Sequence, residues 1–414
     1  MPKVRAAAEV FAAFLALGCT SFGGPIAHLG YFREAFVQRR RWLSEAEYTE
    51  LVTVAQILPG PTSSQVGLAI GRHRAGLAGA AAAWLGFTLP AGLAMILAAV
   101  FAASLTGEVM RTLATALGVA ALGVIAHAVL GMARPLLRSW LSVGIAIGAA
   151  VLVVLLPSTL APVLAIVAAG ILGAMLPAAM RRRDDDAGQN TASSGSPSAP
   201  GRARPAAWFA IALVALGLVA LPIAQALTPD RAVAVADGAA RAGALVVGGG
   251  HTLLPLLEAE LVHGGLVAGA DLTAGYGLVQ VMPGPLFTLA GYAGAAAGTD
   301  GPSPWLGVLG LVAVFLPGML LMLGVLPYWQ RLRSVARLRA AIDLASAAAV
   351  GVLAAAFLHL VVSSAEATAD SGPLVQGLLV LMAIGVGIAL QRRVPAWLAV
   401  PAGTFAAIAV LWWL

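Results

Sequence analysis

The sequence predicts an all-α polytopic membrane protein built from two inverted-topology repeats with broken or re-entrant helices, with about 9–13 membrane helices. Composition is the first observation: 60% of the 414 residues are hydrophobic, 10% are charged, and the mean hydropathy is +0.93. Soluble domains carry about a quarter charged residues, so this chain could not cover a water-facing surface. Its apolar stretches run continuously rather than alternating, which favours helices over barrel strands.

An internal repeat is the second observation. Residues 55–61 (AQILPGP) recur as residues 279–285 (VQVMPGP), and a glycine-rich turn precedes each of them, at 21–25 (SFGGP) and 247–250 (VGGG). The paired residues keep one offset, 280 − 56 = 224: they are Gln56, Pro59, Gly60, Pro61 and Gly67, with Glu47 falling on Asp271. Chance is a poor explanation for such a pattern.

The domain plan follows from the repeat. Long apolar spans follow each Pro-Gly-Pro element, at 76–104, 108–133, 138–156 and 159–178, and at 303–327, 338–362, 373–390 and 395–413. We therefore expect a first repeat over 1–180, a flexible cytoplasmic linker over 181–206, an extra inverting transmembrane helix over 207–227, and a second repeat over 228–414. If each repeat crosses the membrane an even number of times, the extra helix inverts the second.

Basic residues test this orientation. With a cytoplasmic N-terminus, all of the 24 lysines and arginines except Arg111, Arg231 and Arg241 fall on the cytoplasmic side. This distribution predicts a multi-pass protein of the bacterial inner membrane and explains the net charge of +6 without nucleic acid. The single cysteine, Cys19, excludes an intramolecular disulfide and a cysteine-based metal cluster.

The breaks are the candidate substrate site. Helices that restart inside a membrane present free N–H groups and a positive dipole end, which suit an anion. Breaks at corresponding places in two repeats are typical of a transporter's binding site, although kinks or close helix packing are the alternative. The predicted substrate-binding residues are Ser21, Gly23, Gly24, His28, Gln56, Gly60, Thr62, Ser63, Gly249, Gly250, His251, Thr252, Gln280 and Gly284.

His28 and His251 lie beside the glycine-rich breaks. Each could add a charge that switches near neutral pH, or each could simply bond a carbonyl at a helix end. Ser44 and Glu47 have the spacing of a capping box for the helix that enters the first Pro-Gly-Pro element.

The sequence resembles the chromate transporter family in its long-chain, two-domain form. The matching stretches are 14–18 (FLALG), 21–28 (SFGGPIAH), 41–44 (RWLS), 56–61 (QILPGP) with Gly67 and Gly71, 248–250 (GGG) and 280–285 (QVMPGP). Val247 departs from the phenylalanine expected before the second set of glycines. The resemblance covers the chain except the linker and implies export of chromate, giving chromate resistance, by proton antiport.

Several functional readings follow. The leading one is a secondary transporter for a tetrahedral oxyanion, with His28, Glu34 and His251 as candidates for coupling to protons. Sulfate or another small anion is the alternative substrate. An enzyme acting on lipid phosphate is disfavoured, since Glu45, Glu47 and Glu50 form the only acidic cluster outside the linker and fit an exposed helix start. We expect no cofactor, no metal and no nucleic-acid partner; a homodimer is one option for the assembly.

Overall fold

The computed structural model describes residues 2–104, 107–156, 158, 160–176, 205–247, 249–329, 335–368 and 372–413, which are helical and contain no strand. Among these residues, six helices are long and apolar enough to cross a membrane: Thr62–Ala102, Thr112–Leu136, Trp208–Leu227, Pro304–Tyr328, Ala336–Glu366 and Gly372–Gln391. Four shorter apolar helices accompany them: Trp140–Leu155, Leu160–Met175, Leu286–Ala296 and Ala396–Trp412. The predicted all-α polytopic membrane fold is confirmed.

The first half of the chain contains eight helical elements in the described ranges. They are α1 (Pro2–Thr20), α2 (Gly24–Phe32), the π-helix η1 (Arg33–Arg39), α3 (Glu45–Ile57), α4 (Thr62–Ala102), α5 (Gly107–Leu136), α6 (Trp140–Leu155) and α7 (Leu160–Met175). Within α4, Ala75 and Gly76 leave helical geometry, with φ of +67° at Gly76, so that a short helix precedes the long apolar span.

The second half follows the same order. After α9 (Pro205–Leu227) come α10 (Arg231–Leu245), the 3₁₀-helix η2 (Gly250–Thr252), α11 (Leu253–Leu257), the π-helix η3 (Glu258–Val262), α12 (Gly269–Val279), η4 (Leu286–Thr288), α13 (Leu289–Ala296), α14 (Pro304–Val325), η5 (Leu326–Tyr328), α16 (Ala336–Ala367), α17 (Gly372–Gln391) and α18 (Ala396–Trp413). The predicted linker lies outside the described residues, apart from Pro205 and Ala206, which begin α9.

The helices break where the sequence predicts. Chain direction changes at Gly23 and Gly24, whose φ angles of +98° and +75° belong to the left-handed region that glycine tolerates. Pro25 then occupies the first turn of α2, where its missing N–H is not needed. We call α1 with α2 and η1 the first hairpin, and α10 with η2, α11 and η3 the second hairpin. Both hairpins end in a π-helix.

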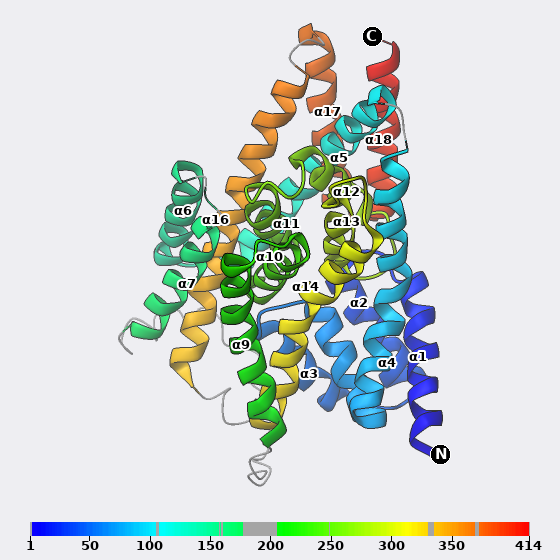
Figure 1. Cartoon of the computed structure of the whole chain (residues 1–414), viewed down its shortest axis with the longest axis vertical. Coiled ribbons are helices and arrows are strands. Elements are labelled where there is room, and N and C mark those ends of the chain that lie inside the picture. Colours follow the sequence, from blue (N-terminus) through cyan, green and yellow to red (C-terminus); the bar gives the residue numbers. More distant parts are fainter. Residues whose placement is uncertain are drawn as a thin grey trace.

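The two halves exchange their peripheral helices (Figure 1). α5 of the first half packs on α17 and α18 of the second, whereas α16 of the second half packs on α6 and α7 of the first. Glycines allow close helix contacts inside each half. A Cβ atom at Gly18 of α1 would lie 2.8 Å from the Phe87 carbonyl of α4, and one at Gly243 of α10 would clash with the Val314 carbonyl of α14. The inverted orientation of the repeats stays a prediction.

α9 belongs to neither repeated series of elements. It packs on α10 and α14 but leaves large apolar side chains such as Trp208, Phe209 and Leu216 exposed. This composition suits a helix that faces lipid. Its role as the inverting span stays a prediction.

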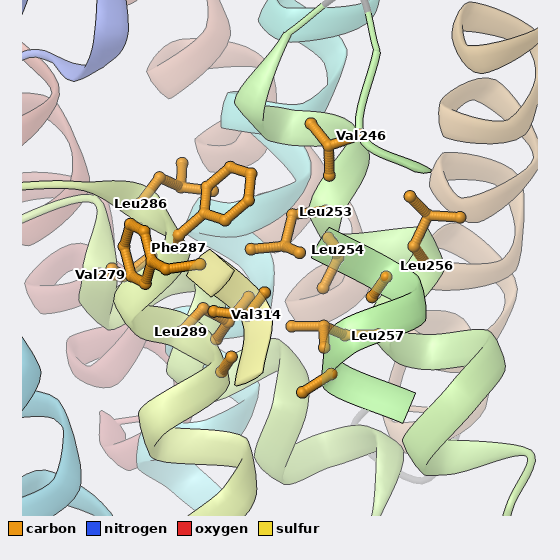
Figure 2. Close-up of a cluster of buried hydrophobic side chains, with 14 of the residues drawn as sticks. Val246, Leu253, Leu254, Leu256, Leu257, Val279, Leu286, Phe287, Leu289 and Val314 are labelled. Carbon is orange, nitrogen blue, oxygen red and sulfur yellow. The ribbon is translucent and has the colours of Figure 1, made fainter. Parts of the chain in front are cut away.

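Buried apolar side chains surround both hairpins. Figure 2 shows the cluster of the second half, in which Leu253 and Leu257 of α11 lie beside Val314 of α14, Leu289 of α13 and Phe287 of η4. Four phenylalanines pack together in the first half. They are Phe14, Phe32, Phe36 and Phe87, each at most 1% exposed.

Candidate functional site

Two reciprocal hydrogen bonds join the halves at their breaks. The amide of Gly60, in the first Pro-Gly-Pro element, donates to the Val246 carbonyl at the end of α10, with 2.8 Å between N and O. The amide of Gly284, in the second element, donates to the Ser21 carbonyl at the end of α1, at 2.9 Å. We call the region around these four residues the crossover. The four breaks, far apart in sequence, therefore meet in one place.

Both crossover glycines are required by conformation and by space. Their φ angles are +121° at Gly60 and +111° at Gly284, which L residues with a side chain rarely adopt. A Cβ at Gly60 would lie 2.8 Å from the Cα of Gly318 in α14, and one at Gly284 would lie 3.0 Å from the Cβ of Ala91 in α4. Each Pro-Gly-Pro element is thus clamped by the long helix of the other half.

His28 organises the first-half side of the crossover. The ring is fully buried, with Nε2 3.2 Å from the Ser21 carbonyl and Nδ1 3.3 Å from the Ser63 hydroxyl. A neutral imidazole satisfies both contacts, since Nε2–H donates to the carbonyl while Nδ1 accepts from the hydroxyl. The Ser21 carbonyl therefore accepts hydrogen bonds both from His28 and from Gly284 of the other half.

The second-half side is built differently. His251 Nδ1 lies 2.8 Å from the Tyr276 hydroxyl on α12. The hydroxyl of Thr252 donates to the Gly249 carbonyl at 2.8 Å and so closes the turn that begins η2. A Cβ at Gly250 would lie 3.6 Å from Pro25 Cγ, so the two glycine-rich breaks also touch.

Buried polar groups without a partner gather near the breaks. Among the described residues, the Ser21 hydroxyl, the Ser64 hydroxyl at the start of α4 and the Gln280 amide nitrogen have no hydrogen-bond partner. An unpaired buried donor is costly, and native structures seldom keep one without a reason. Donors that make no hydrogen bond within the protein are suited to an anion that supplies the missing oxygens.

Some predicted residues lie outside this arrangement. The Gln56 side chain is exposed on α3, and Gly23 is exposed at its turn. Glu34 pairs with Arg39 at 2.7 Å, and its side chain is 45% exposed. Thr62, by contrast, begins α4 beside Ser63, while Gly249 precedes η2 and Gly250 is its first residue. Gly248 lies outside the described residues.

One polar residue near the first break was not among the predicted binding residues, and one charged cluster was not expected at all. Gln65 is fully buried and donates from Nε2 to the carbonyls of Pro59 and Gly318, both at 2.9 Å, so it joins the first break to α14. Asp237, Arg241 and Glu260 form a buried ionic group, although no acidic cluster was expected outside the linker beyond the start of α3. The sequence signal was an i, i+4 pair of opposite charges, Asp237 and Arg241, in a helix whose other charged residue is Arg231 at its start.

Comparison with known proteins places this geometry in context. The family model described as "Chromate transporter" matches residues 8–174 and 233–410. The chain is 29% identical over 390 residues to the chromate transport protein of Pseudomonas aeruginosa, covering 88% of this chain and 84% of the relative. It is also 29% identical over 355 residues to the probable chromate transport protein of Synechococcus elongatus, covering 84% and 82%.

A third relative is more distant. The chromate transport protein of Cupriavidus metallidurans is 25% identical over 360 residues, which cover 84% of this chain and 80% of the relative. No solved structure matches the chain.

Proposed function

The chain belongs to the chromate transporter family, and from that premise we propose that it exports chromate from the bacterial cytoplasm in exchange for protons. Family membership supports transport of chromate across a membrane by a polytopic helical protein. The direction of transport, its coupling to protons and the resulting chromate resistance are the proposed part.

The crossover is the observation that carries the proposal. Chromate is a doubly charged tetrahedral oxyanion, whose oxygens need hydrogen-bond donors from several directions. The unpartnered donors come from both halves: Ser21 and Ser64 from the first, Gln280 from the second. We propose that the anion binds among these side chains, near the bilayer midplane.

Helix N-termini supply further positive potential in this model of binding. α2 begins at Gly24 and α4 begins at Thr62, each directly after a break, and η4 begins at Leu286 after the second Pro-Gly-Pro element and continues into α13. The first N–H groups of such a helical segment have no partner within it, and the peptide dipoles add partial positive charge there. Side chains and helix ends of both repeats would then hold the anion while the repeats rock about it.

The alternative substrate is sulfate, which has the same shape and charge as chromate. The crossover donors do not discriminate between the two, because hydrogen bonds to oxyanion oxygens depend on shape and charge rather than on the central atom. Competition by sulfate against labelled chromate separates the readings: strong competition favours a general oxyanion carrier.

Transport by purified protein in proteoliposomes tests the proposal. With labelled chromate inside and an inwardly directed proton gradient, the wild type should drive chromate out of the vesicles. Gln280→Ala removes one unpartnered donor and should weaken the apparent affinity for chromate by about 10- to 100-fold, the effect of losing a hydrogen bond to a charged group. Thr53→Ala, an exposed hydroxyl on α3, is the matched control. Equal affinities in both variants would contradict the assigned site.

A further inference from the structure

Three charged side chains join the two arms of the second hairpin. Arg241 of α10 places Nη2 2.8 Å from Asp237 Oδ2 on the same helix and 2.7 Å from Glu260 Oε2 on η3. Asp237 is 3% exposed and Glu260 is 5% exposed, while the Arg241 side chain is 27% exposed. We call these residues the triad. It links the helix before the second break to the helical segment after it.

The triad does not balance its own charge. Two carboxylates share one guanidinium, so the fully ionised group carries a net charge of −1 in an apolar setting. Asp237 Oδ1 and Glu260 Oε1 are buried and have no hydrogen-bond partner among the described residues. A buried carboxylate oxygen without a donor is disfavoured, and one guanidinium cannot neutralise two carboxylates. Binding a proton relieves both deficits.

Neighbouring elements provide no further counter-ion. Of the elements that pack on α10 and η3 within the described ranges, α7, α9, α11 and α14 contain no ionisable side chain. η3 also carries Glu258, whose Oε1 lies 2.6 Å from His359 Nδ1, and His263 follows η3. α12 carries Asp271 and Tyr276, the latter bonded to His251. Arg241 is therefore the one cation among these neighbours that contacts the triad carboxylates.

The fold does not need these charges to hold a hairpin together. The reciprocal bonds of Gly60 and Gly284 pair Val246 with Ser21, an offset of 225, so Asp237 corresponds to Ala12 and Arg241 to Ala16. Amides of the following turn bond the Phe36 carbonyl in the first half and the Leu261 carbonyl in the second, so Glu260 corresponds to Ala35. In the first hairpin Phe36 stacks on Phe14, with 4.7 Å between ring centroids, and joins the same two arms without any charge. Replacing buried ion pairs with apolar groups is often neutral or stabilising, so stability alone does not explain the triad.

We propose that the triad is the proton-binding site of the transport cycle and that Glu260 takes up the proton. The inference rests on the proposed proton-coupled function. The Glu260 carboxylate binds one proton from the water on one side of the membrane. This proton changes the net charge of the triad from −1 to 0. Glu260 releases that proton to the other side, while Arg241 stays paired with Asp237 one turn away on the same helix.

Proton binding at Glu260 affects the crossover through α10, which connects Arg241 to Val246. Arg241 precedes Val246 by five residues, a rise of about 7.5 Å along a helix. The Val246 carbonyl accepts the hydrogen bond from Gly60. Neutral Glu260 loses most of its attraction to Arg241, so the arms of the second hairpin are held together less tightly. Glu260 also lies in a π-helix, a distortion that often occurs at functional sites.

Glu260→Gln tests the assignment, with Glu258→Gln as the matched control two residues away on η3. Both variants and the wild type are reconstituted into proteoliposomes. Two rates are measured: chromate–chromate exchange at equal pH, which needs no net proton movement, and chromate movement driven by an imposed pH gradient. We expect Glu260→Gln to keep exchange, to lose gradient-driven movement and to lose the pH dependence of exchange. Glu258→Gln should keep all three.

Each other result has a definite meaning. Gradient-driven movement retained in Glu260→Gln overturns the triad as the proton site and leaves the proposed function intact. Exchange lost together with gradient-driven movement, in a variant whose thermal unfolding matches the wild type, also overturns it, because Glu260 would then be needed for chromate passage itself. Absence of exchange and of gradient-driven movement in the wild type overturns the proposed function, and the inference with it.

Discussion

In the first hairpin Phe36 stacks on Phe14, whereas in the second hairpin Glu260 lies against Gly238 and reaches Arg241. The backbone plan is the same in both, since each has a helix, a glycine break and a second arm that ends in a π-helix. The chemistry that joins the arms is different. Aromatic stacking does not respond to pH or to membrane potential, but a buried ionic group responds to both.

This contrast assigns different tasks to the two halves. The arms of the first hairpin are joined by aromatic packing and by the bond of His28 to the Ser21 carbonyl, and the one charge pair between them, Glu9 with Arg40, is exposed. The first hairpin can therefore act as a fixed support for the crossover. The second is held by charges that are expensive to bury and depend on one another. Replacing one member of such a group should therefore be far worse than replacing the whole group, and only the second hairpin should show this behaviour.

The largest expected effect is that of Arg241→Leu, which removes the guanidinium and leaves two buried carboxylates without a counter-ion. We expect a loss of about 3–5 kcal/mol in the free energy of unfolding, as for other broken buried ion pairs. A triple variant should recover most of that loss in stability; it combines Asp237→Ala, Arg241→Leu and Glu260→Leu. Thermal unfolding of the purified protein measures both, with the exposed Arg392→Leu as control. A combined variant no better than the single one would contradict the reading.

Gly238→Ala should have the next largest effect. Its Cβ would lie 3.0 Å from Leu261 Cδ2 and 3.1 Å from Glu260 Cβ, so η3 would have to move away from α10. Overpacking of this kind costs about 1–3 kcal/mol. Gly217→Ala on α9, where a Cβ would meet no atom within 4 Å, is the control and should be neutral or slightly stabilising. Similar unfolding temperatures for both variants would show that the arms of the second hairpin are not tightly joined.

Phe36→Leu should weaken the first hairpin modestly. The substitution keeps an apolar side chain but removes stacking on Phe14 and on Trp42, whose ring centroid lies 4.8 Å away, at a cost of about 1 kcal/mol. The pH dependence of transport should stay that of the wild type, because no charge is altered. A shifted pH profile in this variant would remove the distinction between a fixed and a proton-responsive hairpin.

The smallest effect concerns the caps of α3 and α12. Ser44 forms a capping box with Glu47, but its counterpart Ala268 offers no side-chain cap. Ser44→Ala should cost about 0.5–1 kcal/mol, and Ala268→Ser should raise stability by a similar amount, both read from thermal unfolding. No change in either variant would show that tertiary packing alone positions these two helix starts.

The Ser44 cap also predicts a pH dependence. Hydrogen bonds from the amide and hydroxyl of Ser44 lower the pKa of Glu47 below its usual value. A carboxyl whose pKa is lower in the folded state stabilises the fold above its unfolded pKa, and this contribution disappears as the pH falls through the folded pKa. The stability difference between wild type and Ser44→Ala should therefore shrink in acid, as measured by unfolding at several pH values. A constant difference would contradict the assignment of the hydrogen bonds.

Much of the fold could be predicted because a helix that crosses a membrane needs a continuous apolar stretch, which is visible in the local sequence. The apolar spans appear at nearly their observed positions, with the predicted 108–133 lying inside α5 and the predicted 373–390 lying inside α17. The helix breaks could be predicted for an equally local reason: glycine permits the left-handed backbone at Gly23 and Gly24, and proline at position 25 starts the next helix. The Ser44 and Glu47 capping box is likewise a short-range pattern, and it is confirmed.

The candidate site was only partly predictable. Sequence reasoning located the breaks but included Gln56, which is exposed on α3, and left out Gln65, which is buried against Gly318. Both are polar residues near the same Pro-Gly-Pro element, and a repeat pattern cannot say which of them faces inward. That depends on the rotation of each short helix, which contacts with the other half determine.

By itself the sequence determined that this protein is helical, lies in a membrane, contains two copies of one unit and breaks its helices at glycine and Pro-Gly-Pro elements. These properties follow from hydropathy and backbone conformation, which act over a few residues. Only the tertiary structure decided that Gly60 meets Val246, that Gly284 meets Ser21, and that Glu260 reaches Arg241 in the second hairpin while Phe36 stacks on Phe14 in the first. Those contacts join residues far apart in the chain, and their energies depend on burial and orientation, which arise only when the two halves pack together.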